Sequence, residues 1–66
     1  MLITDTAEIE AMVQQALLEN PEAASQLAAG NTKAAQTLMG AVMRISRGRA
    51  EPSLTQTLIG YLVEKY

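Results

Sequence analysis

Cysteine, histidine, tryptophan and phenylalanine are all absent from the 66-residue chain. Without cysteine or histidine there is no disulfide, no thiolate nucleophile and none of the commonest metal ligands and general bases. The serines therefore have no imidazole to activate them. No glycine-rich loop followed by Lys-Ser or Lys-Thr is present to hold a nucleotide phosphate. The sequence accordingly predicts no catalytic residue and no metal site, and it argues against catalysis by this chain alone.

Long hydrophobic runs are absent too. No apolar stretch reaches the roughly 18 residues that a membrane-spanning helix needs, and the N-terminus lacks the basic stretch and apolar core of a signal peptide. We therefore expect a cytoplasmic protein without a membrane partner. Hydrophobic residues make up 48% of the chain and charged residues 18%, a balance typical of a folded domain. A chain of this length allows one domain at most, of modest stability.

Helix-capping signals divide this single domain into short helices. Asp5 and Glu8 have the spacing of a capping box. Asn20 and Pro21 end the first helix and begin the second, with Asn20 as the cap. Gly30 is suited to the left-handed conformation that closes the second helix. The predicted helices span about 6–19, 21–29, 32–47 and 52–64.

The last two helices have signals of their own. Asn31 or Thr32 caps the third helix, and Gly48 is its natural terminator. Arginines occupy its last turn, where the helix dipole favours cations. A short loop then leads to Pro52 at the start of the fourth helix.

Apolar residues recur at helical spacing, and no segment shows the alternation of a surface strand. The first helix carries Ile9, Met12, Val13, Ala16 and Leu17 at this spacing. The fourth helix carries Leu54, Leu58, Tyr61 and Leu62. On a helical wheel, the core side of the third helix holds Ala35, Leu38, Met39, Val42 and Ile45. The pattern predicts an all-α fold, a small bundle of three to four short helices.

Charge is distributed unevenly, although the net charge is only −2. Residues 1–32 hold five acids and no base, whereas residues 33–49 hold four bases and no acid. The wheel places the bases of the third helix opposite its apolar side. A glycine falls within this basic stripe, which consists of Lys33, Gly40, Arg44 and Arg47.

The glycine in this stripe requires a reason, because glycine in an exposed helix costs about 1 kcal/mol relative to alanine. A missing side chain lets another backbone approach closely, and a nucleic-acid backbone is one candidate. Arginines can fork onto phosphate oxygens. No aromatic residue accompanies them, so we expect contact through backbone and shape rather than base stacking. The candidate RNA-binding residues are Lys33, Gly40, Arg44, Arg47, Gly48 and Arg49.

Two plainer interpretations stay open on charge and periodicity alone. Arginines near a helix C-terminus are often only dipole partners and solubilising charge, and Gly48 is an ordinary helix stop. The pattern of residues 36–40, Gln-Thr-Leu-Met-Gly, returns as Gln-Thr-Leu-Ile-Gly at residues 56–60. Two copies are too few for a stacked repeat array, so we interpret them as two core helices with a glycine each.

At these residues the sequence resembles a known family. Residues 38–54 are similar to the signature of the amidotransferase B/YqeY family, through a glycine-methionine-basic element and a basic-glycine-basic-alanine element. Residues 6–10 and 19–23 also resemble the tail of the B-type subunit of the aspartyl/glutamyl-tRNA amidotransferase. The positions that match the signature are Gly40, Met43, Arg44, Arg47, Gly48, Arg49, Ala50 and Pro52.

The resemblance implies a function. The whole B-type subunit uses ATP and magnesium to amidate tRNA-bound Glu or Asp with ammonia from its partner subunit, and none of that catalytic domain is expected here. The tail is a helical module that contacts the outer corner of the tRNA. The resemblance thus implies tRNA and the rest of the parent subunit as partners, and no DNA. It implies no cofactor in this chain, and it implies that Met43 and Ala50 pack rather than touch RNA.

The match has departures and alternatives. Glu51 stands where the family usually has asparagine, which weakens the basic patch, and Gly60 replaces a polar helix former, which loosens the last helix. The family domain is about twice this long, so the chain resembles its C-terminal half. The same module is also appended to glutaminyl-tRNA synthetases and occurs as a stand-alone YqeY protein.

A different class of function is a protein-docking helical bundle. In that interpretation an apolar surface would bind the rest of the parent protein. The residues of this surface are Met39, Met43, Leu58 and Ile59.

Overall fold

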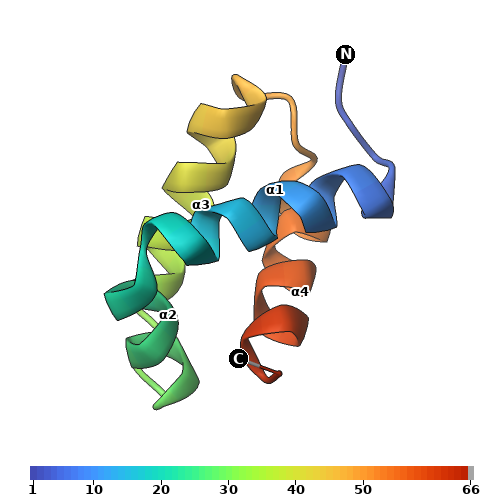
Figure 1. Cartoon of the computed structure of the whole chain (residues 1–66). Coiled ribbons are helices and arrows are strands. Elements are labelled where there is room, and N and C mark those ends of the chain that lie inside the picture. The colour runs from blue at the N-terminus through green and yellow to red at the C-terminus, as the bar shows by residue number, and fades with distance from the viewer. Residues whose placement is uncertain (66) are drawn as a thin grey trace.

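The computed structural model describes residues 1–65, which fold into four helices. They are α1 (Thr6–Glu19), α2 (Pro21–Ala28), α3 (Ala34–Ser46) and α4 (Pro52–Val63). In Figure 1, α1 crosses α3 and α4, and it packs against both. Helix α2 packs chiefly against α3. The predicted all-α bundle is confirmed, with each helix boundary within two residues of its predicted position.

The start and end of α1 follow from two side chains. The Asp5 carboxylate accepts a hydrogen bond from the Ala7 N–H at 2.9 Å, which confirms the predicted cap. The hydrogen bonds of residues 1–65 do not include the reciprocal bond between Glu8 and the Asp5 backbone. At the other end, the Asn20 side-chain amide donates to the Ala16 carbonyl at 3.0 Å.

The prediction that Asn20 caps α2 was therefore wrong, because the Asn20 side chain caps the end of α1 instead. It makes no capping bond to α2. Asn20 has a φ of −132° and a ψ of 64°, which is not the extended conformation of a typical N-cap residue. The amide of Asn20 is thus free to satisfy a carbonyl that the end of α1 leaves unpaired.

Helix α3 begins two residues later than predicted. The Asn31 side chain accepts a hydrogen bond from the Lys33 N–H at 3.2 Å, so it caps a turn that precedes the helix. Lys33, the residue before α3, makes no side-chain cap. Gly30 has a φ of 101°, which confirms its predicted left-handed role at the end of α2.

The core lies where α1, α3 and α4 meet. The predicted stripe of α1 is confirmed, since all its members are buried except Met12, which is partly buried. In α3, Leu38 and Val42 are fully buried, but the buried side is rotated toward Ala34 and Ala41. The remaining members of the predicted stripe, Ala35, Met39 and Ile45, are only partly buried.

The stripe predicted for α4 is displaced by one position from the most buried side, since Leu54, Leu58 and Leu62 pack against the core but are only partly buried. The buried residues of α4 are Thr55, Ile59 and Val63, whereas Tyr61 is 50% exposed. Thr55 tolerates complete burial because its hydroxyl donates to the Glu51 carbonyl at 2.8 Å. Hydrophobic periodicity treats threonine as polar, so it could not reveal this face.

None of the helices in residues 1–65 has the length and hydropathy that crossing a bilayer requires. Within the same residues, acidic side chains do not gather into a group of three or more able to hold a metal ion.

Candidate functional site

The predicted basic stripe is concentrated at one end of α3. Arg44 lies in its last turn, and Arg47 and Arg49 lie in the loop that leads to α4. All three side chains are exposed. Lys33 is exposed as well but stands at the opposite end of α3, about 16 Å from Arg44 at the helical rise. The structure therefore gathers the arginines and leaves Lys33 apart.

Gly40 lies on the solvent side of α3, as the wheel predicted. It is exposed, and a Cβ built on it would meet no atom within 4 Å. No packing requirement excludes a side chain here, so no contact within residues 1–65 offsets the local cost of about 1 kcal/mol. Gly40, Arg44, Arg47, Gly48 and Arg49 together form what we name the arginine surface.

The loop in this surface has an unusual backbone. Helix α3 ends at Ser46, and Arg47 takes a left-handed conformation with a φ of 57°. Gly48 follows with a φ of 76°, and its N–H donates to the Met43 carbonyl at 2.8 Å. Gly48 is thus left-handed directly after the C-cap residue, as predicted for the terminator, and Arg47 adds a second left-handed residue that was not predicted. A left-handed arginine costs roughly 1–2 kcal/mol.

Ser46 holds this loop together, a role that sequence reasoning missed. Its side chain is 6% exposed. The hydroxyl oxygen accepts from the Ala50 N–H at 3.1 Å, and the hydroxyl donates to the Met43 carbonyl at 3.4 Å. Ala50 is fully buried, which confirms that it packs rather than faces solvent. A serine in the last turn followed by a left-handed residue was the available signal, since serine often bonds to nearby backbone.

The N-terminal segment fixes the other edge of the loop. Ile3 forms an isolated parallel bridge with Ala50. The Ile3 N–H donates to the Arg49 carbonyl at 2.6 Å, and the Glu51 N–H donates to the Ile3 carbonyl at 3.0 Å. These two backbone bonds frame the end of the loop and hold Arg49 in place. No sequence pattern indicated this pairing, because a single bridge has no alternation of apolar and polar residues.

Glu51, the acid next to the arginine surface, has a structural role at the start of α4. Its carboxylate accepts hydrogen bonds from the Ser53 N–H at 3.0 Å and the Leu54 N–H at 2.8 Å, so it caps α4. These bonds, chiefly that from Leu54, lower the pKa of the Glu51 carboxyl. The negative charge is thus directed at the positive end of a helix dipole. Gly60 does not interrupt α4, which runs continuously to Val63.

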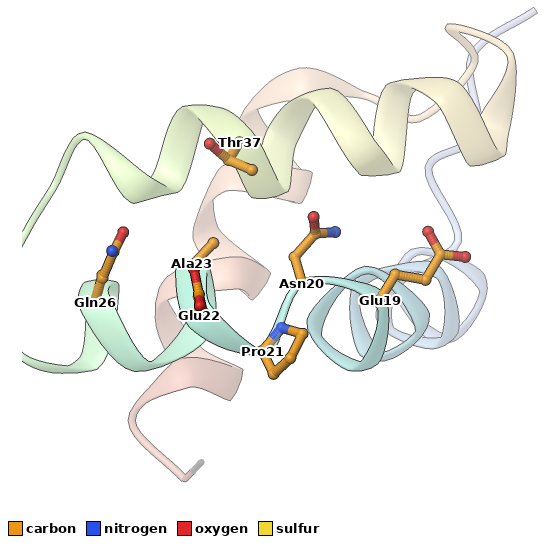
Figure 2. A pocket seen from close by; sticks show the side chains of 7 residues that line it. All are labelled: Glu19, Asn20, Pro21, Glu22, Ala23, Gln26 and Thr37. Carbon is orange, nitrogen blue, oxygen red and sulfur yellow. The ribbon is translucent and has the colours of Figure 1, made fainter.

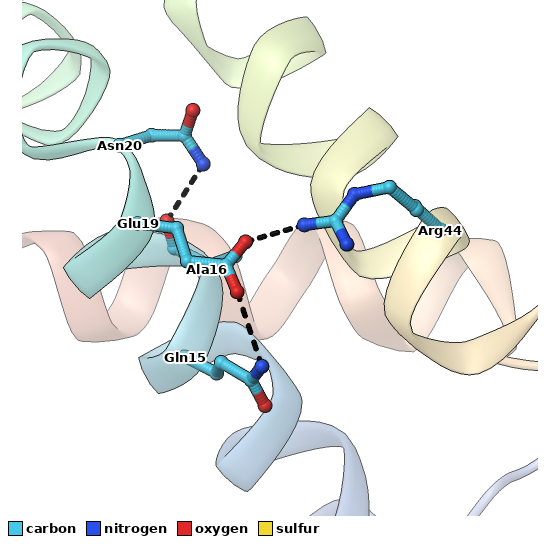
Figure 3. A network of polar contacts seen from close by, with 5 residues as sticks. All are labelled: Gln15, Ala16, Glu19, Asn20 and Arg44. Carbon is cyan, nitrogen blue, oxygen red and sulfur yellow. Dashed lines mark hydrogen bonds and ion pairs between the residues drawn. The ribbon is translucent and has the colours of Figure 1, made fainter.

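Arg44 has a partner within the chain. Its guanidinium pairs with the Glu19 carboxylate at the end of α1, and Gln15 donates to the same carboxylate at 3.1 Å (Figure 3). This is the single ion pair among residues 1–65. Arg44 is 65% exposed and Glu19 37% exposed, so solvent screens their attraction. Arg47 and Arg49 are consequently the arginines that make no ion pair within residues 1–65.

An acid-lined hollow bounds the surface on the side of Thr37. Figure 2 shows Glu19 and Glu22 lining this hollow of about 470 Å³ at the corner between α1 and α2. Glu19 is paired with Arg44, but Glu22 makes no ion pair within residues 1–65, and its carboxylate disfavours an anion there. A second hollow, the α3–α4 groove, has a volume of about 430 Å³ and no charged lining. Its walls are formed by Ala35, Gln36, Met39, Gly40, Gln56 and Ile59.

The alternative docking surface is largely covered. Ile59 is 2% exposed, and Met39, Met43 and Leu58 are partly buried against the core. Ile59 was therefore assigned to this surface wrongly, because the one-position rotation of α4 carries it inward, whereas the other three residues remain partly exposed. The exposed large hydrophobic side chains within residues 1–65 are Met1, Leu2, Leu18 and Tyr61.

Known proteins resemble the chain over nearly its full length. A family model described as the GatB domain matches residues 1–62. The B-type subunit of an aspartyl/glutamyl-tRNA(Asn/Gln) amidotransferase from Neisseria meningitidis serogroup B is 47% identical over 86% of this chain. Proteins of the same name from Corynebacterium efficiens and Chromobacterium violaceum are 41% and 39% identical, over 88% and 86% of this chain.

The similarity concerns only a small part of each relative. The chain spans about 12% of the length of the curated relatives that it matches, and the matched part is their C-terminal domain. No solved structure matches the chain. The extent of the family match and the level of identity show that this chain belongs to the GatB domain family and corresponds to the C-terminal, YqeY-like domain of the amidotransferase's B-type subunit.

Proposed function

We propose that this chain is a tRNA-binding accessory module of a tRNA-dependent amidotransferase, and that its arginine surface contacts the outer corner of the tRNA. The observation that carries the proposal is the exposed pair Arg47 and Arg49, free of ion-pair partners within residues 1–65 and held on a framed loop. The relatives are subunits of enzymes whose names include tRNA(Asn/Gln). A polyanion is therefore a ligand that both the surface and the family context support.

The physical basis is preorganisation. Ordering a flexible arginine loop on binding would cost conformational entropy, and a loop already fixed by backbone bonds avoids much of that cost. The Ala50 N–H donates to the Ser46 hydroxyl and the Ile3 N–H donates to the Arg49 carbonyl, and these two bonds fix the backbone after Gly48. The Gly48 N–H itself donates to the Met43 carbonyl. Two guanidinium groups can then approach adjacent phosphates, and Gly40 leaves room for the sugar-phosphate backbone to pass close to α3.

We further propose that the module selects and holds tRNA while the rest of the subunit performs the reaction. The candidate residues are arginines and glycines, which suit electrostatic recognition of phosphate rather than nucleophilic or acid–base chemistry. ATP and magnesium would then belong to the catalytic part of the parent subunit. As the C-terminal half of a longer family domain, the module would act attached to that subunit.

The test is the affinity of the chain for unmodified tRNA, measured by fluorescence anisotropy at low salt. Arg47→Ala/Arg49→Ala should lower the affinity at least about tenfold, because two phosphate contacts are lost. Lys65→Ala is the matched control, since it removes one positive charge from the far end of α4, where Lys65 donates to the Tyr61 hydroxyl. The control should bind tRNA as the parent does.

Equal affinity of the double arginine variant and the parent would refute the proposed surface. Circular dichroism establishes that each variant is folded, since exposed substitutions of this kind usually change stability by less than about 0.5 kcal/mol. Equal losses of binding free energy per positive charge removed, in the arginine and lysine variants, would also count against the proposal, because they would indicate unspecific attraction by net charge.

A further inference from the structure

We infer that the α3–α4 groove receives an unpaired base of the RNA that the arginine surface binds. The inference rests on the proposed function and extends it from phosphate contact to base recognition. The groove lies between the two copies of the Gln-Thr-Leu-apolar-Gly pattern, and its walls come from both of them. Residues 36–40 and 56–60 do not form a repeat array. Their similarity instead places matching side chains on the two walls of this groove.

The polar groups at the groove are two matched amides. Gln36 on α3 and Gln56 on α4 occupy the same position in the two copies, and both are exposed. Each amide carries one acceptor oxygen and a donor NH₂ group. This combination pairs with the edges of nucleobases, which present donors and acceptors side by side. Two amides on opposite walls can therefore hold a base by its edge.

The floor of the groove is apolar. Ile59 is 2% exposed, and Met39 and Ala35 are partly buried beside it. A methionine thioether makes favourable contact with an aromatic ring, so Met39 suits the face of a base in a surface that lacks aromatic side chains. The volume of about 430 Å³ falls within the range of small-ligand sites.

The charge of the lining limits the possible occupants. No charged side chain lines the α3–α4 groove, whereas Glu19 and Glu22 line one hollow and Glu64 lines another. A fourth hollow, which includes Lys65, has no carboxylate either, but its lining includes no residue of the arginine surface. The groove is thus a hollow that a polyanion can approach without meeting a carboxylate in its wall. It also opens beside the arginine surface.

Gly40 connects the groove to that surface. It forms part of the groove wall, and Arg44 follows it by one helical turn. A nucleic-acid backbone that passes over Gly40 toward the arginines therefore carries its base at the mouth of the groove. This arrangement assigns the missing side chain a purpose, which is close approach of a nucleotide.

The experiment compares two RNA probes, a hairpin with an unpaired loop and the same stem as a blunt duplex. The parent chain should prefer the hairpin by about tenfold, the scale of a good amide–base contact. Gln36→Leu/Gln56→Leu should lose this preference while keeping its affinity for the duplex. Gln14→Leu/Gln26→Leu is the matched control, since it removes two exposed amides on α1 and α2, outside the groove.

The outcomes separate the inference from the proposed function. Equal affinity of the parent for hairpin and duplex, with binding that still depends on Arg47 and Arg49, overturns the groove alone. Retention of the hairpin preference in the Gln36→Leu/Gln56→Leu variant also overturns it. Failure of the parent to bind either RNA, while it still binds tRNA through Arg47 and Arg49, overturns the groove alone, whereas failure to bind tRNA as well overturns the proposed function and the groove with it. Loss of preference confined to the groove variant supports the inference.

Discussion

Helices α3 and α4 contain nearly the same five residues but present different sides of them to the core. In residues 36–40, Leu38 is fully buried and Met39 only partly so. In residues 56–60 the order reverses, because Ile59 is 2% exposed and Leu58 only partly buried. One residue corresponds to a rotation of about 100° around a helix. The two copies are therefore alike in sequence and different in orientation.

The surroundings of the two glycines differ as well. Gly40 and Gly60 are both exposed and both have open space where a Cβ would stand. Gly40 borders the uncharged α3–α4 groove and precedes the arginines, whereas Gly60 borders a hollow that includes Glu64. The five-residue pattern thus produces a helix with an exposed glycine in both copies. The neighbouring helices and the charges around each glycine decide which of the two copies a polyanion could approach.

The rotation predicts unequal costs for matched core substitutions. Leu38→Ala should lower the free energy of unfolding by about 2–5 kcal/mol, the range for a fully buried leucine, and this is a large fraction of the stability of so small a domain. Leu58→Ala should cost clearly less, because that side chain is already partly in water. Urea unfolding followed by circular dichroism measures both. Equal losses would show that the two copies pack alike, contrary to the structure.

The glycines provide the second test. Gly40→Ala and Gly60→Ala should each raise the free energy of unfolding by up to about 1 kcal/mol, because alanine is the better helix former and meets no neighbour. Only Gly40→Ala should weaken tRNA binding, since its methyl group stands in the path of the backbone. Thermal melting measures the stability of each variant, and fluorescence anisotropy measures its affinity for tRNA.

A destabilised Gly40→Ala chain would mean that the glycine packs closely against another element. Equal weakening of tRNA binding by both alanine variants would remove the distinction between the two helices.

The starts of α3 and α4 differ in their response to pH. Glu51 caps α4 with its carboxylate, whereas Lys33 makes no side-chain cap at α3. The folded state lowers the pKa of Glu51, so its stabilisation is fully present at neutral pH. That stabilisation declines as the pH falls below about 4.5, the ordinary glutamate value, and toward the lower folded pKa. Glu51→Gln should lower Tm at pH 7.

The same variant should approach the parent in Tm as the pH falls below that range, because the parent's carboxylate is then protonated as well. A difference in Tm that stays constant from pH 7 to acid conditions would contradict the capping role. Lys33→Ala serves as the comparison at the uncapped helix and should show no such convergence.

The smallest effect is expected for the ion pair between α1 and α3. Arg44→Ala should change the free energy of unfolding by no more than about 1 kcal/mol, because exposed ion pairs are weak and screened. A double-mutant cycle with Glu19→Gln isolates the pair from other effects of each substitution. A coupling much above that value would mean that Arg44 is primarily a structural residue rather than part of the arginine surface.

Much of the fold could be predicted because its signals are local. Asp5, Pro21 and Gly30 act within one turn of the chain, and the helix boundaries followed from such residues. The rotation of α4 could not be predicted, because burial of Thr55 depends on a backbone partner that hydropathy does not record. The direction in which Asn20 bonds was hidden for the same reason.

The candidate site also has features that could be predicted from the sequence and features that could not. The placement of exposed arginines at the end of α3 followed from charge and periodicity, and the family followed from the glycine and arginine spacing. The pairing of Arg44 with Glu19 and the bridge between Ile3 and Ala50 join residues far apart in the sequence. Such contacts arise from tertiary packing, so no spacing rule reveals them.

The most direct test of the central claim is the salt dependence of tRNA binding. Each phosphate contact contributes about −0.7 to −0.9 to the slope of log K against log salt concentration. Arg47→Ala/Arg49→Ala should therefore flatten the slope by about 1.5 relative to the parent, while Lys65→Ala should leave it unchanged. An unaltered slope in the double arginine variant would contradict the claim that the framed arginine loop of α3 binds the tRNA backbone.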